Sequence, residues 1–381
     1  MKLCAVTQSY APTGGGVRTM LHAERDWCRE QGLEHVLIVP GAEDAVTRDG
    51  PLTTYTVASP LLPGSAMYRL LYRSNRVLRI LRDELPDVIE VHCAYNLPWT
   101  ALWHRRRHPA VVSALYMTDL PVAYVETPLR KRAGRHVAGA ARHVAERYLR
   151  ALYGRCDIVV AISPVMRDRL HDMGLPQAMY VPLGVDLDTF SPARRSPDVR
   201  TRLGAGDDDL VMVYAGRLDA EKRPDIVFDA FDRLPAHLNA RLVIAGEGPM
   251  RAHLEERAQA DPRARVIPFV QDRAELAALL ATCDIYVSAM AHETFGLSVV
   301  EAQACGLPVV GVRAGAMVDR VVDGVDGFLV DPDTPAAMAD RISATPRDDW
   351  RRMGQRARTR VEAEFSWRRT FQTLLQIYRS R

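Results

Sequence analysis

The sequence predicts an α/β fold built from two Rossmann-like, doubly wound units with parallel sheets. The first observation is length, because 381 residues exceed what one hydrophobic core serves, and roughly 150 residues per domain gives two or three units. The second is the alternation of short apolar runs with amphipathic stretches from end to end, which is typical of parallel sheets joined by helices. The third is a break in this pattern at residues 184–192, where Pro, Asp and Gly gather.

The expected strands are mostly uninterrupted apolar runs, as strands covered on both faces require. In the first half they are Leu3–Gln8, His35–Pro40, Asp87–His92, Ala110–Tyr116, Asp157–Ser163 and Ala178–Leu183, and in the second half Leu210–Gly216, Arg241–Gly246, Val266–Val270, Asp284–Ser288, Pro308–Val312 and Phe328–Val330. Helical spacing predicts a helix over Val17–Glu30. A second helix is expected to place on one face Met67, Leu70, Leu71, Val77, Leu78, Leu81 and Leu85.

The break at residues 184–192 predicts a first domain of residues 1–185 and a second of residues 192–362. Ligands of doubly wound sheets bind outside the carboxyl ends of the strands. Two such domains that face each other would therefore place all their strand-end loops on one shared cleft.

Composition and charge exclude several classes of protein. The formal charge of +3 gives no argument for nucleic acid, and none is expected as a partner. The six cysteines are widely spaced, without metal-ligand spacing, and are expected to be buried and reduced. The first residues resemble a strand and not a signal peptide, and no apolar run reaches the ~20 residues of a membrane span. We therefore expect a cytoplasmic protein.

Two cations follow the strand Leu210–Gly216. Arg217 and Lys222 lie in the loop before a helix whose first residue is expected to be Pro224. Fixed cations lower the barrier to cleavage of a nucleotide diphosphate ester, because they strengthen their hold as charge develops on the leaving phosphate. A charged surface loop is an equally good interpretation of this segment taken alone.

Two glutamates follow the strand Asp284–Ser288. Glu293 is expected in the loop and Glu301 on a helix that starts near Ser298, and the backbone N–H groups of residues 296–298 offer a place for phosphate. Carboxylates bind sugar hydroxyls well because each oxygen accepts hydrogen bonds. The alternative interpretation makes Glu301 a surface residue and Glu293 a capping acid.

Taken together, these segments closely resemble family 4 of the retaining glycosyltransferases. The resemblance rests on Ala215-Gly216-Arg217-Leu218, Glu221-Lys222-Arg223-Pro224, Gly246-Glu247-Gly248-Pro249, Glu293-x-Phe295-Gly296-Leu297 and Glu301-Ala302-x-Ala304-Cys305-Gly306, with Phe365-Ser366-Trp367 near the end. It implies the two-domain GT-B fold, with the first domain binding the acceptor and the second the nucleotide-sugar donor. It also implies that a C-terminal helix, residues 366–381, packs back on the first domain.

The resemblance assigns roles to residues of the second domain. Arg217 and Lys222 are expected to bind the donor diphosphate, and Glu301 the ribose. Glu293, together with the backbone of Phe295, Gly296 and Leu297, is expected to hold the donor sugar. Val270 lies where the base is expected.

The first domain offers a glycine-rich segment after its first strand. Glycines let the backbone approach a ligand closely, and a helix N-terminus favours an anion. By the resemblance, Gly15 and Gly16 are expected to touch the donor phosphates, joined by Arg18. A turn without a ligand is the alternative for a lone run of three glycines, Gly14 to Gly16.

The first domain departs from the family at one position. Met117 stands where the family commonly carries a His near the reacting face of the donor sugar, and a thioether neither accepts a proton nor binds a hydroxyl well. Asp119 is expected to take part of that role. Tyr116 and His92 are further acceptor-side candidates, although an isolated His at a strand end is more often a local hydrogen-bonding residue.

A basic stretch covers residues 130–155. Its cations make a basic amphipathic helix that either contacts an anionic membrane surface or binds a phosphorylated acceptor. The alternative, which we favour slightly, is a solvated helix that covers the core with Val137, Ala141, Val144, Tyr148 and Leu149.

The sequence therefore predicts a retaining hexosyltransferase that moves a sugar from a UDP- or GDP-linked donor to a hydroxyl of a carbohydrate, lipid or small molecule. Neither a metal nor another cofactor is expected, because Arg and Lys replace the metal at the diphosphate in this fold. The alternative is a weak or inactive nucleotide-sugar-binding protein, which Met117 keeps open. A phosphorylase is disfavoured, because no segment resembles a pyridoxal-phosphate lysine site.

Overall fold

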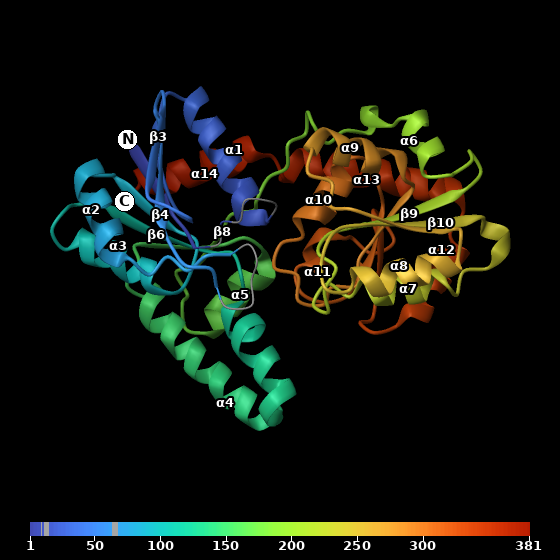
Figure 1. Cartoon of the computed structure of the whole chain (residues 1–381), viewed down its shortest axis with the longest axis horizontal. Coiled ribbons are helices and arrows are strands. Elements are labelled where there is room, and N and C mark those ends of the chain that lie inside the picture. The colour runs from blue at the N-terminus through green and yellow to red at the C-terminus, as the bar shows by residue number, and fades with distance from the viewer. Residues whose placement is uncertain (9, 11–14, 63–67) are drawn as a thin grey trace. The chain divides into compact units, whose positions relative to one another are not determined.

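The chain divides into two units in a computed structural model that describes residues 1–8, 10, 15–62 and 68–381 (Figure 1). Unit 1 comprises Met1–Leu183 and Trp367–Arg381, and unit 2 comprises Gly184–Ser366. Each unit is a mainly parallel sheet with helices, so the predicted α/β fold class is confirmed. The shared cleft and the separate binding roles of the two domains stay predictions.

The sheet of unit 1 has, within the described residues, the strand order β3-β4-β2-β1-β5-β6-β7-β8. The pairs are parallel except β3 with β4. The strands are β1 (Lys2–Val6), β2 (Glu34–Gly41), β3 (Ala45–Asp49), β4 (Leu52–Ala58), β5 (Val88–Val91), β6 (Val111–Tyr116), β7 (Ile158–Ala161) and β8 (Met179–Tyr180).

Strands β3 and β4 were not expected from the sequence. All five residues of β3 are exposed, so this edge strand lacks the apolar run by which the other strands were recognised. In β4 only Leu52, Tyr55 and Val57 are buried, and threonines separate them. The antiparallel hairpin of β3 and β4 therefore extends a sheet that was expected to be parallel throughout.

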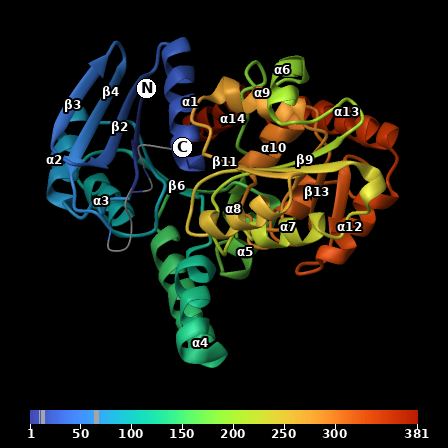
Figure 2. The same ribbon diagram turned by 45° about the vertical axis from the view of Figure 1, so that its right-hand side comes forward.

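The helices of unit 1 are α1 (Gly16–Glu30), α2 (Ser74–Glu84), α3 (Asn96–Arg105), the π-helix η1 (Pro121–Glu126), α4 (Thr127–Tyr153), α5 (Pro164–Asp172) and α14 (Trp367–Arg379). Helix α14 lies beside α1 (Figures 1 and 2), where the rings of Trp27 and Phe371 are 5.7 Å apart. The Tyr378 hydroxyl donates to the buried Glu90 carboxylate. The C-terminal helix thus completes the core of unit 1.

The predicted second helix was placed too early in the chain. Helix α2 begins at Ser74, so Leu70 and Leu71 precede it, and Met67 lies outside the described residues. Val77 and Leu81 are buried as expected. Leu85 is instead a left-handed C-cap (φ 46°) with 57% of its surface exposed, because the helix turns there towards β5.

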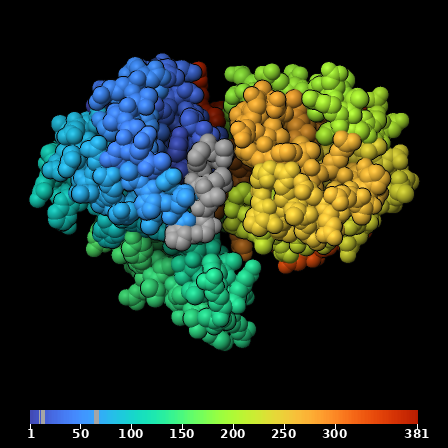
Figure 3. All heavy atoms as spheres, viewed as in Figure 1, coloured from blue at the N-terminus to red at the C-terminus, as the bar shows by residue number. Residues whose placement is uncertain are grey.

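Helix α4 covers the core only with its last turns, where Leu149, Leu152 and Tyr153 belong to the core of unit 1, and not with Val137 and Val144 as the favoured interpretation of residues 130–155 required. It projects from unit 1 in all three whole-chain views (Figures 1, 2 and 3). Ala138 and Leu149 are buried, but Val137 and Val144 are 53% and 68% exposed. Gly134 interrupts the helix with φ 78°, so the segment before it extends away from the sheet.

The sheet of unit 2 has the order β11-β10-β9-β12-β13-β14 in the described residues and is parallel. Its strands are β9 (Leu210–Ala215), β10 (Ala240–Ala245), β11 (Ala264–Ile267), β12 (Ile285–Val287), β13 (Val309–Val312) and β14 (Gly327–Val330). Its helices are η2 (Pro192–Arg194), α6 (Pro197–Arg202), α7 (Pro224–Phe231), η3 (Ala236–Leu238), α8 (Arg251–Ala260), α9 (Arg273–Thr282), α10 (Leu297–Ala304), α11 (Met317–Arg320), α12 (Pro335–Ala344) and α13 (Arg347–Glu364).

The two ends of unit 2 are bound to each other. The Val185 N–H donates to the Phe365 carbonyl at 2.9 Å. The Arg358 guanidinium donates to the Phe190 carbonyl at 2.6 Å. The segments by which the chain enters and leaves unit 2 therefore lie side by side.

All six cysteines are free thiols and buried, as expected. No helix within the described ranges combines the length and apolarity that a membrane span needs.

Candidate functional site

The strongest candidate site lies at the carboxyl ends of β9 and β12. These strands pair in parallel, so the loops that follow them emerge at the same edge of the sheet. The loop after β9 carries Lys222, and the loop after β12 carries Glu293. The Lys222 ammonium donates to the Glu293 carboxylate at 3.0 Å. Two segments that are 71 residues apart thus form one ion pair.

The loop that holds Lys222 is fixed by the Asp219 side chain and by close packing of its glycines. The Asp219 carboxylate accepts from the backbone N–H groups of Glu221 and Lys222 at 3.1 and 3.0 Å. Pro224 begins α7 as predicted, after Arg223 in a left-handed conformation (φ 55°). A side chain at Gly246 would lie 1.9 Å from the Gly216 carbonyl, so this loop packs where only glycine fits.

Glu293 is a buried carboxylate that stays charged. Only 8% of its surface is exposed, and burial raises its pKa. The Lys222 ammonium and the N–H groups of Phe295 and Thr294 outweigh burial, so the pKa of Glu293 is lowered below its ordinary value. The pair is therefore a preformed polar site that offers both a cation and a hydrogen-bond acceptor.

The segment after Glu293 leads directly into α10. Gly296 is its N-cap with φ 84°, and no side chain caps the helix. Gly315 packs so closely on the Glu293 loop that a side chain there would lie 2.7 Å from the Glu293 carbonyl. The free backbone N–H groups at the N-terminus of α10 therefore suit a phosphate or a sugar hydroxyl.

Glu301 is buried on α10, which excludes its interpretation as a surface residue. Its carboxylate accepts from the Arg273 guanidinium at 2.5 Å. Burial outweighs Arg273 and raises the pKa of Glu301. Arg273 also lies 4.6 Å over the ring of Phe190, so the carboxylate is held in place from the side of α9.

Phe295 is the base of a buried cation–π stack. The Arg320 guanidinium lies 4.5 Å from the centroids of both Phe295 and Phe365. The two rings also meet edge to face at 6.1 Å. The candidate sugar loop is thereby packed against the segment that leaves unit 2.

Arg217 and Val270 lie at the same carboxyl edge but make weaker contacts. Arg217 is paired with Asp219 and Glu221 at 2.7 and 2.9 Å, and its side chain is 58% exposed. Val270 follows β11 and is half-buried. Both are placed as the sequence predicted, and their roles stay predictions.

In unit 1, one group of candidates is connected. The Tyr116 hydroxyl donates to the Asp119 carboxylate at 2.9 Å. Arg169 of α5 forms an ion pair with the same carboxylate. Asp119 thus lies at the end of β6 as a structurally bound anion.

The other unit 1 candidates are His92, Met117, Gly15, Gly16 and Arg18. His92 is 3% exposed without a hydrogen-bond partner for either ring nitrogen in the described structure, and burial lowers its pKa to about 3. Met117 is buried after β6. Gly15 is the N-cap of α1 (φ 96°), followed by Gly16 and Arg18 in the first turn. Most of the loop before Gly15 lies outside the described residues.

Sequence comparison decides the family. The model described as Glycosyl transferases group 1 matches residues 196–360, and that described as Glycosyltransferase Family 4 matches residues 14–189. A GDP-mannose-dependent alpha-(1-6)-phosphatidylinositol dimannoside mannosyltransferase of Mycobacterium tuberculosis is 33% identical over 98% of this chain and 95% of its own. The chain belongs to glycosyltransferase family 4.

A further relative of this glycosyltransferase supports the family assignment, and solved structures show the fold. A GDP-mannose-dependent alpha-mannosyltransferase of Corynebacterium glutamicum is 27% identical over 87% of the chain and 77% of its own length. Among solved structures, sucrose-phosphate synthase of Thermosynechococcus elongatus has a TM-score of 0.79 at 20% identity, covering 100% and 99% of the two chains. The structure of Anabaena HepE in complex with UDP and glucose has a TM-score of 0.76 at 18% sequence identity, and the match covers 100% of both chains. These structures confirm the GT-B fold.

Sequence reasoning missed three residues that contact the candidate site: Arg273, Arg320 and Gly315. Each acts through a residue that was predicted, namely Glu301, Phe295 and Glu293. Arg273 opens a helix and carries no signal of its own in the sequence. Gly315 carried a weak one, since it follows a buried strand, where a close backbone approach often requires glycine.

Proposed function

We propose that this glycosyltransferase transfers a mannosyl group from GDP-mannose to a hydroxyl of a lipid-linked or carbohydrate acceptor, with retention of anomeric configuration. The observation that carries the proposal is the Lys222–Glu293 pair beside the uncapped N-terminus of α10. The choice of GDP-mannose over a UDP-sugar follows the GDP-mannose-dependent activities of the relatives from M. tuberculosis and C. glutamicum.

In this proposal different residues of unit 2 bind different parts of the donor. Lys222 and Arg217 bind the diphosphate, Glu293 accepts hydrogen bonds from the mannosyl hydroxyls, and Glu301 accepts from the ribose. Binding the diphosphate draws Lys222 partly away from Glu293, whose backbone N–H donors keep it charged. Lys222 then strengthens its hold as negative charge develops on the departing phosphate. No metal is needed for that stabilisation.

The reaction proceeds by attack on the face from which the nucleotide leaves. The bond between the anomeric carbon and the phosphate oxygen breaks, and the acceptor oxygen bonds to the same carbon. The acceptor proton passes to the departing phosphate, which leaves as GDP. Asp119 is already bound by Tyr116 and Arg169, which disfavours it as a nucleophile.

The test measures donor binding and product configuration. Thermal shift with GDP-mannose, GDP-glucose, UDP-glucose and UDP-galactose is expected to show the largest stabilisation by GDP-mannose, because a ligand of the folded state raises its melting temperature. Transfer to a phosphatidylinositol mannoside is expected to give an α-mannoside from the α-linked donor. An inverted product would exclude the mechanism, and binding without any turnover would favour the inactive nucleotide-sugar-binding protein.

We further propose that the exposed face of α4 contacts an anionic membrane surface. Arg130, Lys131, Arg132 and Arg135 are exposed on the projecting segment, together with Val137. Cations next to exposed apolar side chains suit the headgroup region of a bilayer. This gives a cytoplasmic, peripheral enzyme whose lipid acceptor is reached at the bilayer.

Vesicle sedimentation tests this contact. The triple variant Arg130→Gln/Lys131→Gln/Arg132→Gln is expected to lose binding to vesicles that contain phosphatidylinositol. The control Arg351→Gln/Arg352→Gln/Arg356→Gln removes the same charge from exposed positions of α13. Equal loss in both variants would show a charge effect without a docking face.

A further inference from the structure

A small cavity lies between α2 and α3 of unit 1, away from the candidate site. It has a volume of about 40 Å³ and is lined by Leu78, Arg82, Trp103, His104, Arg107 and His108. Leu78 and Arg82 lie on α2, which precedes β5, whereas the other four lie at the end of α3 or in the turn between α3 and β6. The cavity therefore lies at the amino edge of the sheet, whereas Tyr116 and Asp119 follow the carboxyl end of β6.

His104 is the buried polar group of this cavity. Its exposed fraction is 2%, and neither ring nitrogen has a hydrogen-bond partner within the described part of the chain. Its ring stacks on that of His108 at a centroid distance of 4.9 Å. A buried donor without a partner destabilises the folded state. Such a group in the wall of a cavity is expected to have a ligand.

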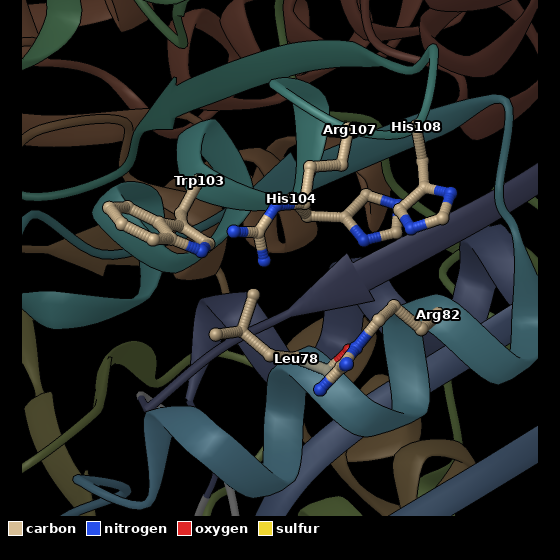
Figure 4. A pocket seen from close by; sticks show the side chains of 6 residues that line it. All are labelled: Leu78, Arg82, Trp103, His104, Arg107 and His108. Carbon is tan, nitrogen blue, oxygen red and sulfur yellow. The ribbon is translucent and has the colours of Figure 1, made fainter.

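The charges around the cavity select an anion. Figure 4 shows the Arg107 guanidinium between the side chains of Trp103 and His104, with Arg82 on the neighbouring helix. Arg82 donates to the Leu78 carbonyl at 3.3 Å, and Arg107 lies 5.7 Å from the Trp103 centroid. Neither guanidinium forms an ion pair with a carboxylate of the described residues. Burial is the main cause that lowers the pKa of His104, and His108 and Arg82 lower it further. The two guanidinium groups, without a carboxylate partner among the described residues, favour an anion over a metal cation.

We infer that this cavity binds a phosphate group through Arg82, Arg107 and the imidazole of His104. One water occupies roughly 10–15 Å³ on the same measure of volume, so about 40 Å³ accommodates a tetrahedral oxyanion. Guanidinium groups match the oxygen geometry of phosphate and are held less strongly by water than ammonium groups. The phosphate belongs either to the phosphodiester of a lipid headgroup or to a free phosphate in solution.

Calorimetry with inorganic phosphate at constant ionic strength tests the site. The protein carries Arg217→Ala and Lys222→Met, so that the candidate donor loops do not contribute. Adding Arg107→Gln is expected to weaken phosphate binding about tenfold, because it removes a charge-assisted hydrogen bond. Adding His104→Gln tests the buried donor, with the melting temperature of each variant confirming that it folds.

Arg106→Gln is the matched control. Arg106 lies 5.5 Å over the same Trp103 ring and carries the same charge, but it does not line the cavity. It is expected to leave phosphate affinity unchanged. Equal weakening by Arg106→Gln and Arg107→Gln, or no heat of binding at saturating phosphate, would overturn the inference.

Two further titrations distinguish the source of the phosphate. Glycerophosphoinositol carries the phosphodiester of a lipid headgroup without its acyl chains. If it competes with inorganic phosphate, and Arg107→Gln reduces sedimentation with phosphatidylinositol vesicles, the site binds a lipid headgroup. If inorganic phosphate binds and the diester does not, the site binds free phosphate.

Discussion

The carboxyl edges of the two sheets differ in how their polar residues are connected. In unit 2, contacts between separate loops and helices fix the candidate residues: Lys222 binds Glu293, and Arg273 binds Glu301. In unit 1 Tyr116 donates to Asp119, which lies three residues further along the same segment. His92 is buried, and neither of its ring nitrogens has a hydrogen-bond partner within the described residues.

The difference indicates a division of labour. A preorganised site suits a donor whose diphosphate and nucleoside do not vary. Charges that are already in place need no reorganisation during the reaction. Acceptors differ between members of a fold, and their sites vary with the loops that carry them. If unit 2 is the preorganised half, substitutions in its candidate site are expected to reduce activity more than substitutions in unit 1.

The largest effect is expected for Lys222→Met. It removes the cation from the developing phosphate charge, and kcat is expected to fall about 10²–10³-fold. The double variant with Glu293→Gln is expected to lose less than the sum of the two single losses, because the two side chains act as a pair. Steady-state kinetics give both values. The control Lys131→Met, at an exposed position of α4, is expected to retain activity with a soluble acceptor. Additive losses in the double variant would contradict the pairing.

The next effect concerns stability in unit 1 at different pH. Burial raises the pKa of Glu24 to about 7 from an ordinary 4.5, so the folded state binds the extra proton. The stability that this proton contributes is therefore present at pH below 4.5 and is lost as the pH rises through about 7. Glu24→Gln is expected to reduce the fall in melting temperature between pH 5 and 8. An unchanged pH profile would show that Glu24 does not titrate in this range.

Glu293 in unit 2 has the opposite dependence. Its lowered pKa means that its contribution to stability is present above its ordinary pKa and is lost as pH falls through the folded value. Glu293→Gln is the variant to compare with Glu24→Gln. It is expected to change how the melting temperature falls when the pH is lowered. The contributions of Glu24 and Glu293 to stability are therefore expected to be lost in opposite directions of pH.

A smaller effect is expected for Glu301→Gln. Loss of the buried carboxylate charge is expected to weaken donor binding about tenfold, in keeping with one charge-assisted hydrogen bond. Arg273→Gln is expected to act in the same direction, because it releases the carboxylate from its position. Glu275→Gln, at an exposed position of α9, is the control. Calorimetry with GDP-mannose measures all three. An unchanged affinity in Glu301→Gln would exclude the ribose role.

The smallest effect is expected for Tyr116→Phe. Asp119 keeps its ion pair with Arg169, so transfer activity is expected to stay within about threefold. Stability is expected to fall by about 1 kcal/mol for the lost hydrogen bond. Denaturant unfolding and kinetics separate the two effects. A large loss of kcat with unchanged stability would instead place Tyr116 in the catalytic machinery of unit 1.

The fold could be predicted because most strands are buried apolar runs in a regular alternation with helices. The failures have local causes. β3 is polar and exposed at the edge of the sheet, and β4 alternates buried residues with threonine. The apolar side chains of α4 suggested a covered face, but hydrophobic spacing does not say whether another element lies opposite, and Val144 is exposed.

The candidate site could be predicted where one loop carries several functional groups. Glu293, Gly296 and Glu301 were recognised together, and so were Arg217 and Lys222. Their partners could not be, because Arg273 meets Glu301 only through packing of α9 on α10. The same holds for Arg320, which reaches Phe295 and Phe365 from α11.

The path of the chain has a consequence for biosynthesis. Unit 2 is one continuous segment, whereas unit 1 is completed only by α14, which follows unit 2. During translation, Ser366, the last residue of unit 2, is added to the chain before any residue of α14. At that time Glu90 still lacks the Tyr378 hydroxyl, and Trp27 lacks the ring of Phe371. The half of the enzyme that is made first is therefore the last to mature, and a ribosome that stalls within the final helix releases a chain with an exposed core.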